Sequence, residues 1–296
     1  MKKKFKSIYA DIALVFVAVC WGAGFVVLKD ALDNISPFNI MAIRFTLAFV
    51  IMALIFNKKL RNLSKQDLKA GFIIGVFLFL GFAVQTVGLK YTVPGKQAFL
   101  TGTNVVIVPF FVWLIHKKAP DKYSIAGAFM TLIGISLLTL KSELGGFDIN
   151  YGDKLTLLCA VFFAAHIVAV GFFTKKHDPI VLAVLQIGVA ALLFIICALM
   201  FEELPRGIES SVWLRIGYLV LFPTVVAFLI QNVAQKSTTS TRTGIILSLE
   251  SVFGALFAVI IYKEEFTIKM ILGCLLIFCA IIITETKLSF LKNKKA

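Results

Sequence analysis

The sequence has few charged residues for its length and lacks the motifs of common enzymes. Only 16% of its 296 residues are Asp, Glu, Lys or Arg, whereas about a quarter are charged in a typical soluble domain. No H-E-x-x-H, G-x-S-x-G or acid-cluster metal motif occurs, and "VPGKQ" at residues 93–97 lacks the glycine and hydroxyl positions of a phosphate-binding loop. We therefore expect no enzyme activity, no cofactor, no bound metal and no ATP-driven process.

Apolar side chains are what the sequence has in excess. Hydrophobic residues make up 59% of the chain, and 29 residues are Phe. One soluble core cannot enclose so much apolar surface, so a lipid bilayer is the expected solvent. The chain is predicted to be an all-α polytopic membrane protein with ten transmembrane helices, each close to the roughly 20 residues that a membrane helix needs. These segments are residues 9–29, 37–56, 68–89, 96–115, 123–140, 154–174, 179–201, 212–234, 243–262 and 267–286.

The net charge of +14 is explained by its distribution along the chain. When the N-terminus is placed in the cytoplasm, most Lys and Arg residues fall on the cytoplasmic side, and the outer loops hold most of the acids. This positive-inside pattern predicts a multi-pass protein of the cell membrane with both termini in the cytoplasm. No basic-aromatic recognition motif is present, so no nucleic-acid partner is expected. The five cysteines form no C-x-x-C pair, which argues against a zinc or redox site.

The chain also repeats itself. A shift of 142 residues aligns Asp11 with Asp153 and Pro37 with Pro179. A four-residue insertion in the second half changes the offset to 146 further along. That second offset aligns Gly71 with Gly217, Phe82 with Phe228, Gln85 with Gln231, Lys90 with Lys236, Lys96 with Arg242 and Gly127 with Gly273. These matches predict two repeats of five helices, residues 9–140 and 153–286.

An odd number of spans per repeat places the two repeats in opposite orientations across the membrane. The loops agree, because "NKKLRNLSKQDLK" at residues 57–69 is basic while its counterpart "EELPRGIESS" at residues 202–211 carries three acids and one Arg. Inverted repeats are common in secondary transporters, where they enclose a site near the membrane midplane.

Three stretches carry a resemblance to a known family. They are "CWGAGFVVLK" at residues 20–29, "NIMAIRFTLA" at residues 39–48 and "LSLESVFGALFAVIIYKEEFTIKMILGCLLI" at residues 247–277. The whole chain resembles the drug/metabolite transporter superfamily, EamA type. It departs from the family pattern at Ser251, where Pro is usual, and at Lys117–Lys118, which replaces an acidic helix end. The resemblance implies transport of amino acids, other small metabolites or drugs, commonly as export.

Glu250 is an acid within an apolar segment, about 12 Å deep if the helix rises 1.5 Å per residue from Arg242. Ionisable groups at such depth face the bundle interior or water. We expect Glu250 to bind a substrate amine or couple transport to protons, or else to fix helix packing. Its repeat partner, Asn104, would line the opposite wall as a neutral acceptor.

Arg44 and His166 are the other ionisable side chains within predicted spans. For Arg44 a structural or gating ion pair is the favoured role, and substrate contact is the alternative. His166 could shuttle a proton or serve as a packing residue.

Several polar and small residues complete the candidate site. Gln85 and Gln231 could contact a polar ligand or hydrogen-bond between helices. Trp21 could stack on a substrate or pack, and Gly22 beside it would permit close helix approach or local unwinding. Lys96 and Arg242 are either an anion-binding pair or, as we favour, anchors at the membrane interface.

Polar groups are sparse and cluster near the middle of the spans, which favours a gated pocket over a continuous pore. We therefore predict a secondary transporter, an exporter of small metabolites such as amino acids or related compounds. It would work by alternating access around a cavity formed mainly by spans one, three, four, six, eight and nine. A passive channel or facilitator and a multidrug efflux protein are the alternatives. The expected partners are a small-molecule substrate, the lipid bilayer, and protons or another coupling ion; the oligomeric state is left open.

Overall fold

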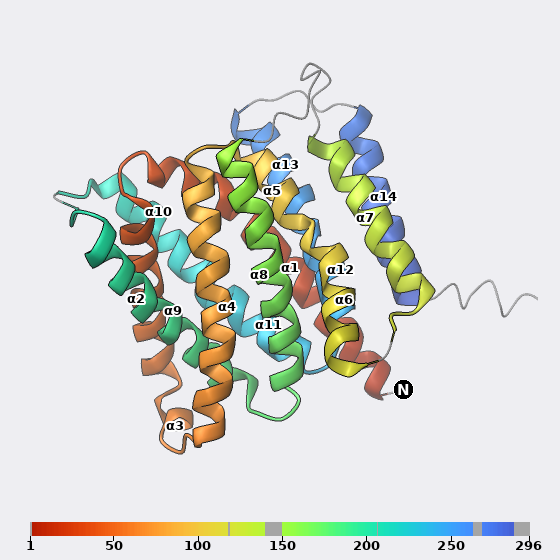
Figure 1. Ribbon diagram of the computed structural model, residues 1–296, viewed down its shortest axis with the longest axis horizontal. Coiled ribbons are helices and arrows are strands. Elements are labelled where there is room, and N and C mark those ends of the chain that lie inside the picture. The colour runs from red at the N-terminus through yellow and green to blue at the C-terminus, as the bar shows by residue number, and fades with distance from the viewer. Residues whose placement is uncertain (1, 118, 140–149, 206, 263–267, 287–296) are drawn as a thin grey trace, which may run out of the picture.

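The computed structural model describes residues 2–117, 119–139, 150–205, 207–262 and 268–286 (Figure 1). Helices make up almost all of these ranges, and no strand occurs in them, which confirms the predicted all-α class. The first half contains α1 (Lys2–Leu32), α2 (Pro37–Ile55), α3 (Asn57–Leu60), α4 (Lys65–Leu89), α5 (Pro94–Gly102), α6 (Asn104–His116) and α7 (Lys122–Thr139). The second half contains α8 (Tyr151–Phe173), α9 (Pro179–Phe201), α10 (Ser210–Val220), the π-helix η1 (Leu221–Val226), α11 (Ala227–Gln235), α12 (Ser240–Leu247), α13 (Leu249–Tyr262) and α14 (Ile268–Thr286).

Eight helical segments of the described chain are long and apolar enough to cross a membrane. Three of them are interrupted: Pro94–Ile115 joins α5 to α6, Ser240–Ile261 joins α12 to α13, and Ser210–Gln235 joins α10, η1 and α11. The other two predicted spans coincide with shorter apolar helices, Lys122–Leu137 and Ile271–Thr284. The protein is therefore a multi-pass membrane protein, whereas the prediction of ten spans is not confirmed. The C-terminal residues 287–296 and the acidic stretch Glu264–Glu265 lie outside the described residues.

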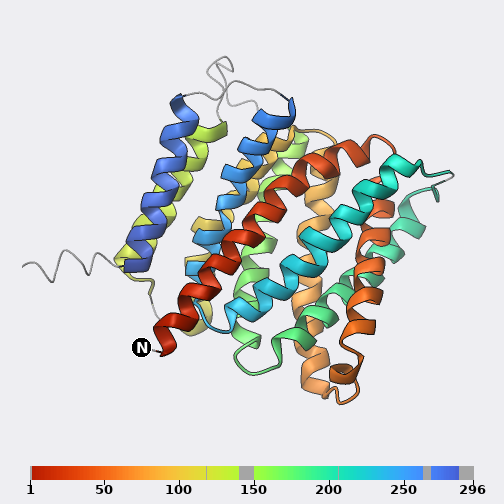
Figure 2. The ribbon, with the colours of Figure 1, turned by 180° about the vertical axis from the view of Figure 1, so that it is seen from behind.

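Helices of the two halves interleave in one bundle. Helix α2 packs on α9, α4 packs on α8 and α9, and α1 packs on α11, α12 and α13. Helices α7 and α14 pack on each other and stand at one edge of the molecule (Figure 1). Seen from behind, α1 and the α10–η1–α11 segment run side by side across the bundle (Figure 2). Since every one of these contacts joins the first half to the second, the halves share one core.

The antiparallel pair α2–α9 is held at both ends by acids. The Glu202 carboxylate, just after α9, accepts hydrogen bonds from the backbone N–H groups of Phe38 (3.0 Å) and Asn39 (2.8 Å) at the start of α2. At the other end Asp178 caps the N-terminus of α9 and pairs with Lys59 at 2.5 Å, just after α2. Helix N-termini carry unsatisfied N–H groups and a positive dipole end, so carboxylates there satisfy both.

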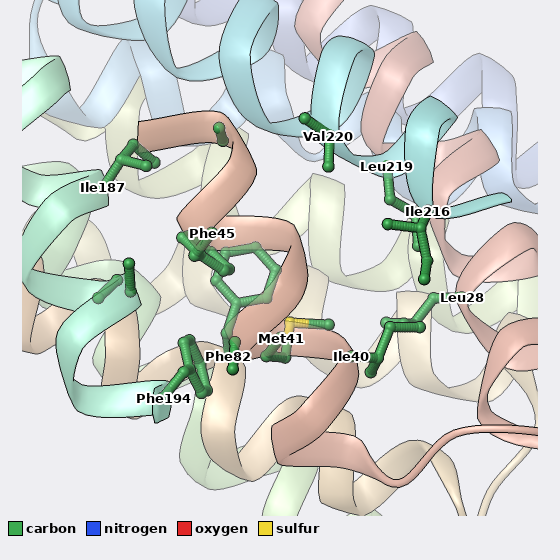
Figure 3. Packing of buried hydrophobic residues seen from close by; sticks show 14 of the residues in the cluster. Leu28, Ile40, Met41, Phe45, Phe82, Ile187, Phe194, Ile216, Leu219 and Val220 are labelled. Carbon is green, nitrogen blue, oxygen red and sulfur yellow. The ribbon is translucent and has the colours of Figure 1, made fainter. Parts of the chain in front are cut away.

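Aromatic rings fill the core between α2, α4 and α9 (Figure 3). The ring centroid of Phe45 lies 5.4 Å from that of Phe82 and 5.2 Å from that of Phe194. Aromatic pairs at such distances contribute about 0.5–1.5 kcal/mol beyond the burial of their area. Helix α10 closes another side of this cluster with Ile216 and Leu219. This packing holds α2 and α4 in position beside the centre of the bundle.

The fourth span of each half is broken at an equivalent place. Helix α5 ends at Gly102, and α12 ends just before Ser248, the residue 146 positions later. The Ser248 hydroxyl donates to the Ile245 carbonyl at 2.6 Å, a local bond that competes with helix continuation. The break is therefore present although Ser251 stands where the resembled family has Pro. The Ser251 hydroxyl instead donates to the Ala98 carbonyl of the other half at 2.8 Å.

Candidate functional site

A cavity lies where the two broken spans meet α1, α4, α8 and α11. The part of its volume that the centre of a water molecule can occupy is about 60 Å³. One water needs roughly 10–15 Å³ by this measure, so the cavity holds only a few waters. Of the predicted site residues, the following line it: Trp21, Arg44, Gln85, Asn104, His166, Gln231 and Glu250. The lining helices belong to predicted spans one, three, four, six, eight and nine, and Arg44 adds span two.

Most of the lining consists of repeat-related pairs. At the offset of 142 the pairs are Trp21 with Phe163, Gly24 with His166, and Phe25 with Ile167. At the offset of 146 they are Phe82 with Phe228, Gln85 with Gln231, Thr101 with Leu247, and Asn104 with Glu250. Both members of each pair line the same cavity. The cavity therefore lies between the two repeats, at the place where their equivalent residues meet.

The two glutamines differ because their neighbours differ. Gln85 donates to the Thr101 hydroxyl at 3.1 Å, and this hydroxyl lies 3.5 Å from the Cys159 sulfur. Leu247 occupies the place of Thr101 in the second repeat and offers no hydrogen bond. Accordingly both polar atoms of the Gln231 amide are buried without a partner among the described residues. Such groups cost free energy unless a ligand or water satisfies them.

Glu250 and Asn104 add further unsatisfied acceptors to the cavity. The Glu250 side chain is buried, with 6% of the residue exposed, and within the described ranges its carboxylate makes no hydrogen bond or ion pair. The Asn104 side-chain oxygen is also buried without a partner there. Together with the Gln231 amide oxygen, three acceptors therefore line one cavity. A bound cation or hydrogen-bond donor would satisfy them.

Arg44 is buried on the α2 side of the cavity and depends on η1 for its contacts. Its Nε donates to the Thr224 hydroxyl at 2.6 Å, and one terminal nitrogen lies 3.4 Å from the Pro223 carbonyl. The guanidinium carbon also lies 5.0 Å from the centre of the Phe82 ring, a cation–π distance. The predicted ion pair is not present: no carboxylate of the described chain lies within 4.0 Å of Arg44.

The π-helix η1 is a feature of the cavity wall that sequence reasoning missed. The Ala227 N–H, which would reach the Pro223 carbonyl in an α-helix, bonds instead to the Phe222 and Thr224 carbonyls. This leaves the Pro223 carbonyl to accept from Arg44 and, at 3.0 Å, from the indole N–H of Trp21. Single-turn π-helices are frequent at functional sites. Pro223, a proline within an apolar span, is the sequence signal from which an irregular turn could have been predicted here.

Gly22 does not line the cavity. A Cβ atom at Gly22 would lie 2.7 Å from the Phe253 Cβ, 2.8 Å from the Gly254 nitrogen and 2.9 Å from the Glu250 carbonyl oxygen. Helix α1 is continuous at this point, so close approach to α13, and not local unwinding, is what the glycine permits. Gly22 thereby sets the distance between α1 and the helix that carries Glu250.

His166 has a polar partner outside the cavity. Its Nε2 lies 2.7 Å from the side-chain oxygen of Gln186 on α9, and its ring meets that of Phe228 edge-on at 5.9 Å. Gln186 is the residue that aligns with Arg44 at the offset of 142. The bond to Gln186 orients the imidazole, and His166 is one of the residues that line the cavity.

Lys96 and Arg242 do not form an anion site, because each is paired with a carboxylate. Lys96 on α5 lies 2.6 Å from Asp153 on α8. Arg242 on α12 pairs with Asp11 on α1. Both ion pairs join the first half of the chain to the second. We had expected these two residues to act only as anchors at the membrane interface.

Known proteins resemble this chain along its whole length. The model of the EamA-like transporter family matches residues 8–140 and again residues 150–286. An uncharacterized transporter of Archaeoglobus fulgidus is 38% identical over 284 residues, which cover 95% of this chain and 87% of that protein. The uncharacterized transporter YyaM of Bacillus subtilis is 26% identical over 82% of this chain and 83% of its own length. A protein crystal structure with 20% identity shares the fold, with a TM-score of 0.77 over 96% of this chain and 98% of that one.

Proposed function

Since the chain belongs to the EamA-like transporter family, we propose that it is a secondary transporter that moves a small metabolite through the central cavity by alternating access. The observation that carries this proposal is the lining of one cavity by repeat-related pairs. Two inverted copies of one helical unit can exchange conformations, and the cavity between them is then exposed to each side in turn.

The proposed topology has ten spans in two inverted repeats, residues 9–140 and 153–286, with both termini in the cytoplasm. The shorter apolar helices α7 and α14 are the fifth span of each repeat in this scheme. Helices α1 and α8, which begin the two repeats, run in opposite directions in Figure 1, which supports inversion. The size of the cavity, a few waters, corresponds in this scheme to an occluded state that must widen to admit a metabolite.

The proposed substrate carries an amino group, as amino acids and related compounds do. Its ammonium group binds the Glu250 carboxylate, which lines the cavity, and the side-chain oxygens of Asn104 and Gln231, which are buried without a partner within the described residues. The buried guanidinium of Arg44, which also lines the cavity, offers a site for a carboxylate. Export is the direction that the family resemblance implies. A proton on Glu250 or His166 is the proposed coupling ion, because both are ionisable and face the cavity.

Efflux of lipophilic cations is a second candidate function. It is favoured by the aromatic rings around the same acid, which suit a large apolar cation. These rings belong to Trp21, Phe25, Phe82, Phe163 and Phe228.

A thermal-shift screen of the purified protein tests these proposals. The panel contains amino acids, nucleosides, sugar phosphates and lipophilic cations. A ligand at a hundredfold excess over its Kd stabilises the folded state by about 2.7 kcal/mol, which raises the melting temperature by several degrees. A shift with amino acids supports the first candidate, and a shift with lipophilic cations alone supports the second. A shift with sugar phosphates alone would contradict both.

The variant Glu250→Gln is the matched test of the amine site. It keeps the shape of the side chain and removes its charge, so the shift caused by an amine ligand should disappear, together with any pH dependence of its uptake. Glu209→Gln is the control, because Glu209 is exposed at the start of α10, and it should leave the shift unchanged. Unchanged binding and pH dependence in Glu250→Gln would remove Glu250 from both roles.

A further inference from the structure

Two ion pairs of this protein are copies of each other by the internal repeat. Asp11 aligns with Asp153 at the offset of 142, and Lys96 aligns with Arg242 at the offset of 146. The Lys96–Asp153 pair joins the fourth span of the first half to the first span of the second half. The Asp11–Arg242 pair joins the fourth span of the second half to the first span of the first half. The repeat has therefore conserved a contact between its two copies as well as the residues.

The two pairs lie at opposite ends of the molecule. Helix α1, which carries Asp11 in its first third, begins at the bottom of Figure 1, and α8, which carries Asp153 in its first turn, begins at the top. Since α5 follows the top end of α4 and α12 follows the bottom end of α11, Lys96 and Arg242 reach the same two ends. Each end of the bundle thus has one of these two repeat-related ion pairs.

Both pairs lie between the cavity and the molecular ends, at matching distances. Along the fourth spans, Lys96 precedes the lining residue Thr101 by five positions, and Arg242 precedes Leu247 by five, which is about 7.5 Å. Along the first spans, Asp153 precedes Phe163 by ten positions, about 15 Å. Asp11 precedes the lining residue Trp21 by the same ten positions.

We propose that the Lys96–Asp153 and Asp11–Arg242 pairs are the two gates of the transport pathway, one at each end of the cavity. The inference rests on the proposed alternating access. In this scheme the structure, in which both pairs are formed, corresponds to the occluded state. Separating Asp11 from Arg242 lets α1 move away from α12 and opens the cavity toward the face that carries the N-terminus. Separating Lys96 from Asp153 lets α8 move away from α5 and opens the opposite face.

Labelling of a single cysteine in the cavity tests the gates without knowledge of the substrate. Asn104→Cys is introduced after the five native cysteines are replaced by Ala, and a membrane-impermeant maleimide is applied to vesicles of each orientation. Protease cleavage of an N-terminal tag identifies the face that carries the N-terminus. Arg242→Gln should accelerate labelling from that face and slow it from the other. Lys96→Gln should do the reverse. Each change is expected to be fivefold or more, the usual range of coupling between linked sites.

Control variants separate gating from general loosening of the bundle. Lys59→Gln breaks the Lys59–Asp178 pair, which also joins the two halves but lies outside the cavity lining, and it should change neither labelling rate. Exchanging the charges in Asp11→Arg with Arg242→Asp should restore the rates of the unmodified gates. If Lys96→Gln does not accumulate in the membrane, Thr92→Ala removes one hydrogen bond to Asp153 and should shift labelling in the same direction by less.

The outcomes distinguish this inference from the function on which it rests. Labelling as fast as that of an exposed cysteine from both faces of the ungated background would indicate a channel and overturn alternating access. Slow background labelling with gate variants that change nothing, or that change both faces alike, would overturn the gates alone.

Discussion

The two ends of the bundle have repeat-related ion pairs, Lys96–Asp153 and Arg242–Asp11, but the contacts around the two acids differ. At the Lys96 end, Asp153 also accepts from the Thr92 hydroxyl at 3.0 Å and from the Asn150 N–H at 2.9 Å, and 1% of its side chain is exposed. At the Arg242 end, the other carboxylate oxygen of Asp11 is buried without a partner in the described chain. The hydroxyl of Thr238, which aligns with Thr92, also lacks a partner there.

Backbone packing differs in the same direction. Gly88 of α4 and Gly152 of α8 bring two helices into backbone contact at the Lys96 end, where a Cβ on Gly152 would lie 2.5 Å from the Gly88 carbonyl oxygen. Their repeat counterparts are Ala10 and Ala234, which border an open groove between α1 and α11. The two proposed gates therefore differ in their surrounding contacts. We expect separation of Asp11 from Arg242 to cost less free energy than separation of Lys96 from Asp153.

Removal of the two acids should give the largest difference in stability between the two ends. Asp153→Ala leaves Lys96 without a buried partner and destroys the capping box at the start of α8, so we expect a loss of about 3–5 kcal/mol in the free energy of unfolding. Asp11→Ala removes a carboxylate whose side chain is 16% exposed and which is no part of a capping box, so the loss should be smaller, about 1–3 kcal/mol. Denaturant unfolding in detergent measures both. Equal losses would show that the two ends are energetically alike.

Adding one methyl group to the close helix contact should have an intermediate effect. Gly152→Ala forces α8 away from α4 and should cost about 1–3 kcal/mol, the usual range for overpacking. Gly217→Ala on α10 is the matched control, since nothing lies within 4 Å of its added Cβ, and it should be neutral or stabilising. Melting temperatures of the two variants give the comparison. A neutral Gly152→Ala would contradict the tight contact.

The two threonines should produce the smallest difference. Thr92→Ala removes a hydrogen bond to Asp153 and should lower stability by about 1 kcal/mol. Thr238→Ala removes a hydroxyl that makes no hydrogen bond within the described residues, so stability should be unchanged. Thermal unfolding of both variants under one condition is sufficient. If Thr238→Ala proves as costly as Thr92→Ala, the Arg242 end is as well bonded as the Lys96 end.

Much of the candidate site was predictable because lipid restricts where polar groups can lie. Glu250, His166, Arg44, Gln85 and Gln231 stand in apolar segments, and all of them face the one cavity of the bundle centre that they line. Their hydrogen-bond partners were not predictable. Whether the Gln231 amide has a hydrogen-bond partner depends on a side chain from another helix. Arg44 contacts a hydroxyl and a carbonyl of η1, whereas an acid was expected.

The sequence by itself determined the class of protein, the repeat and the residues that must avoid lipid. The internal repeat aligned the acid Asp11 with Asp153 and the base Lys96 with Arg242. It did not show which acid forms an ion pair with which base. Only the tertiary structure decided that. Arg242 meets Asp11 across 231 positions of sequence, because the first span of each half packs against the fourth span of the other. The apolar patterns of these spans fix burial alone, and partner choice is set by the crossing of helices in space.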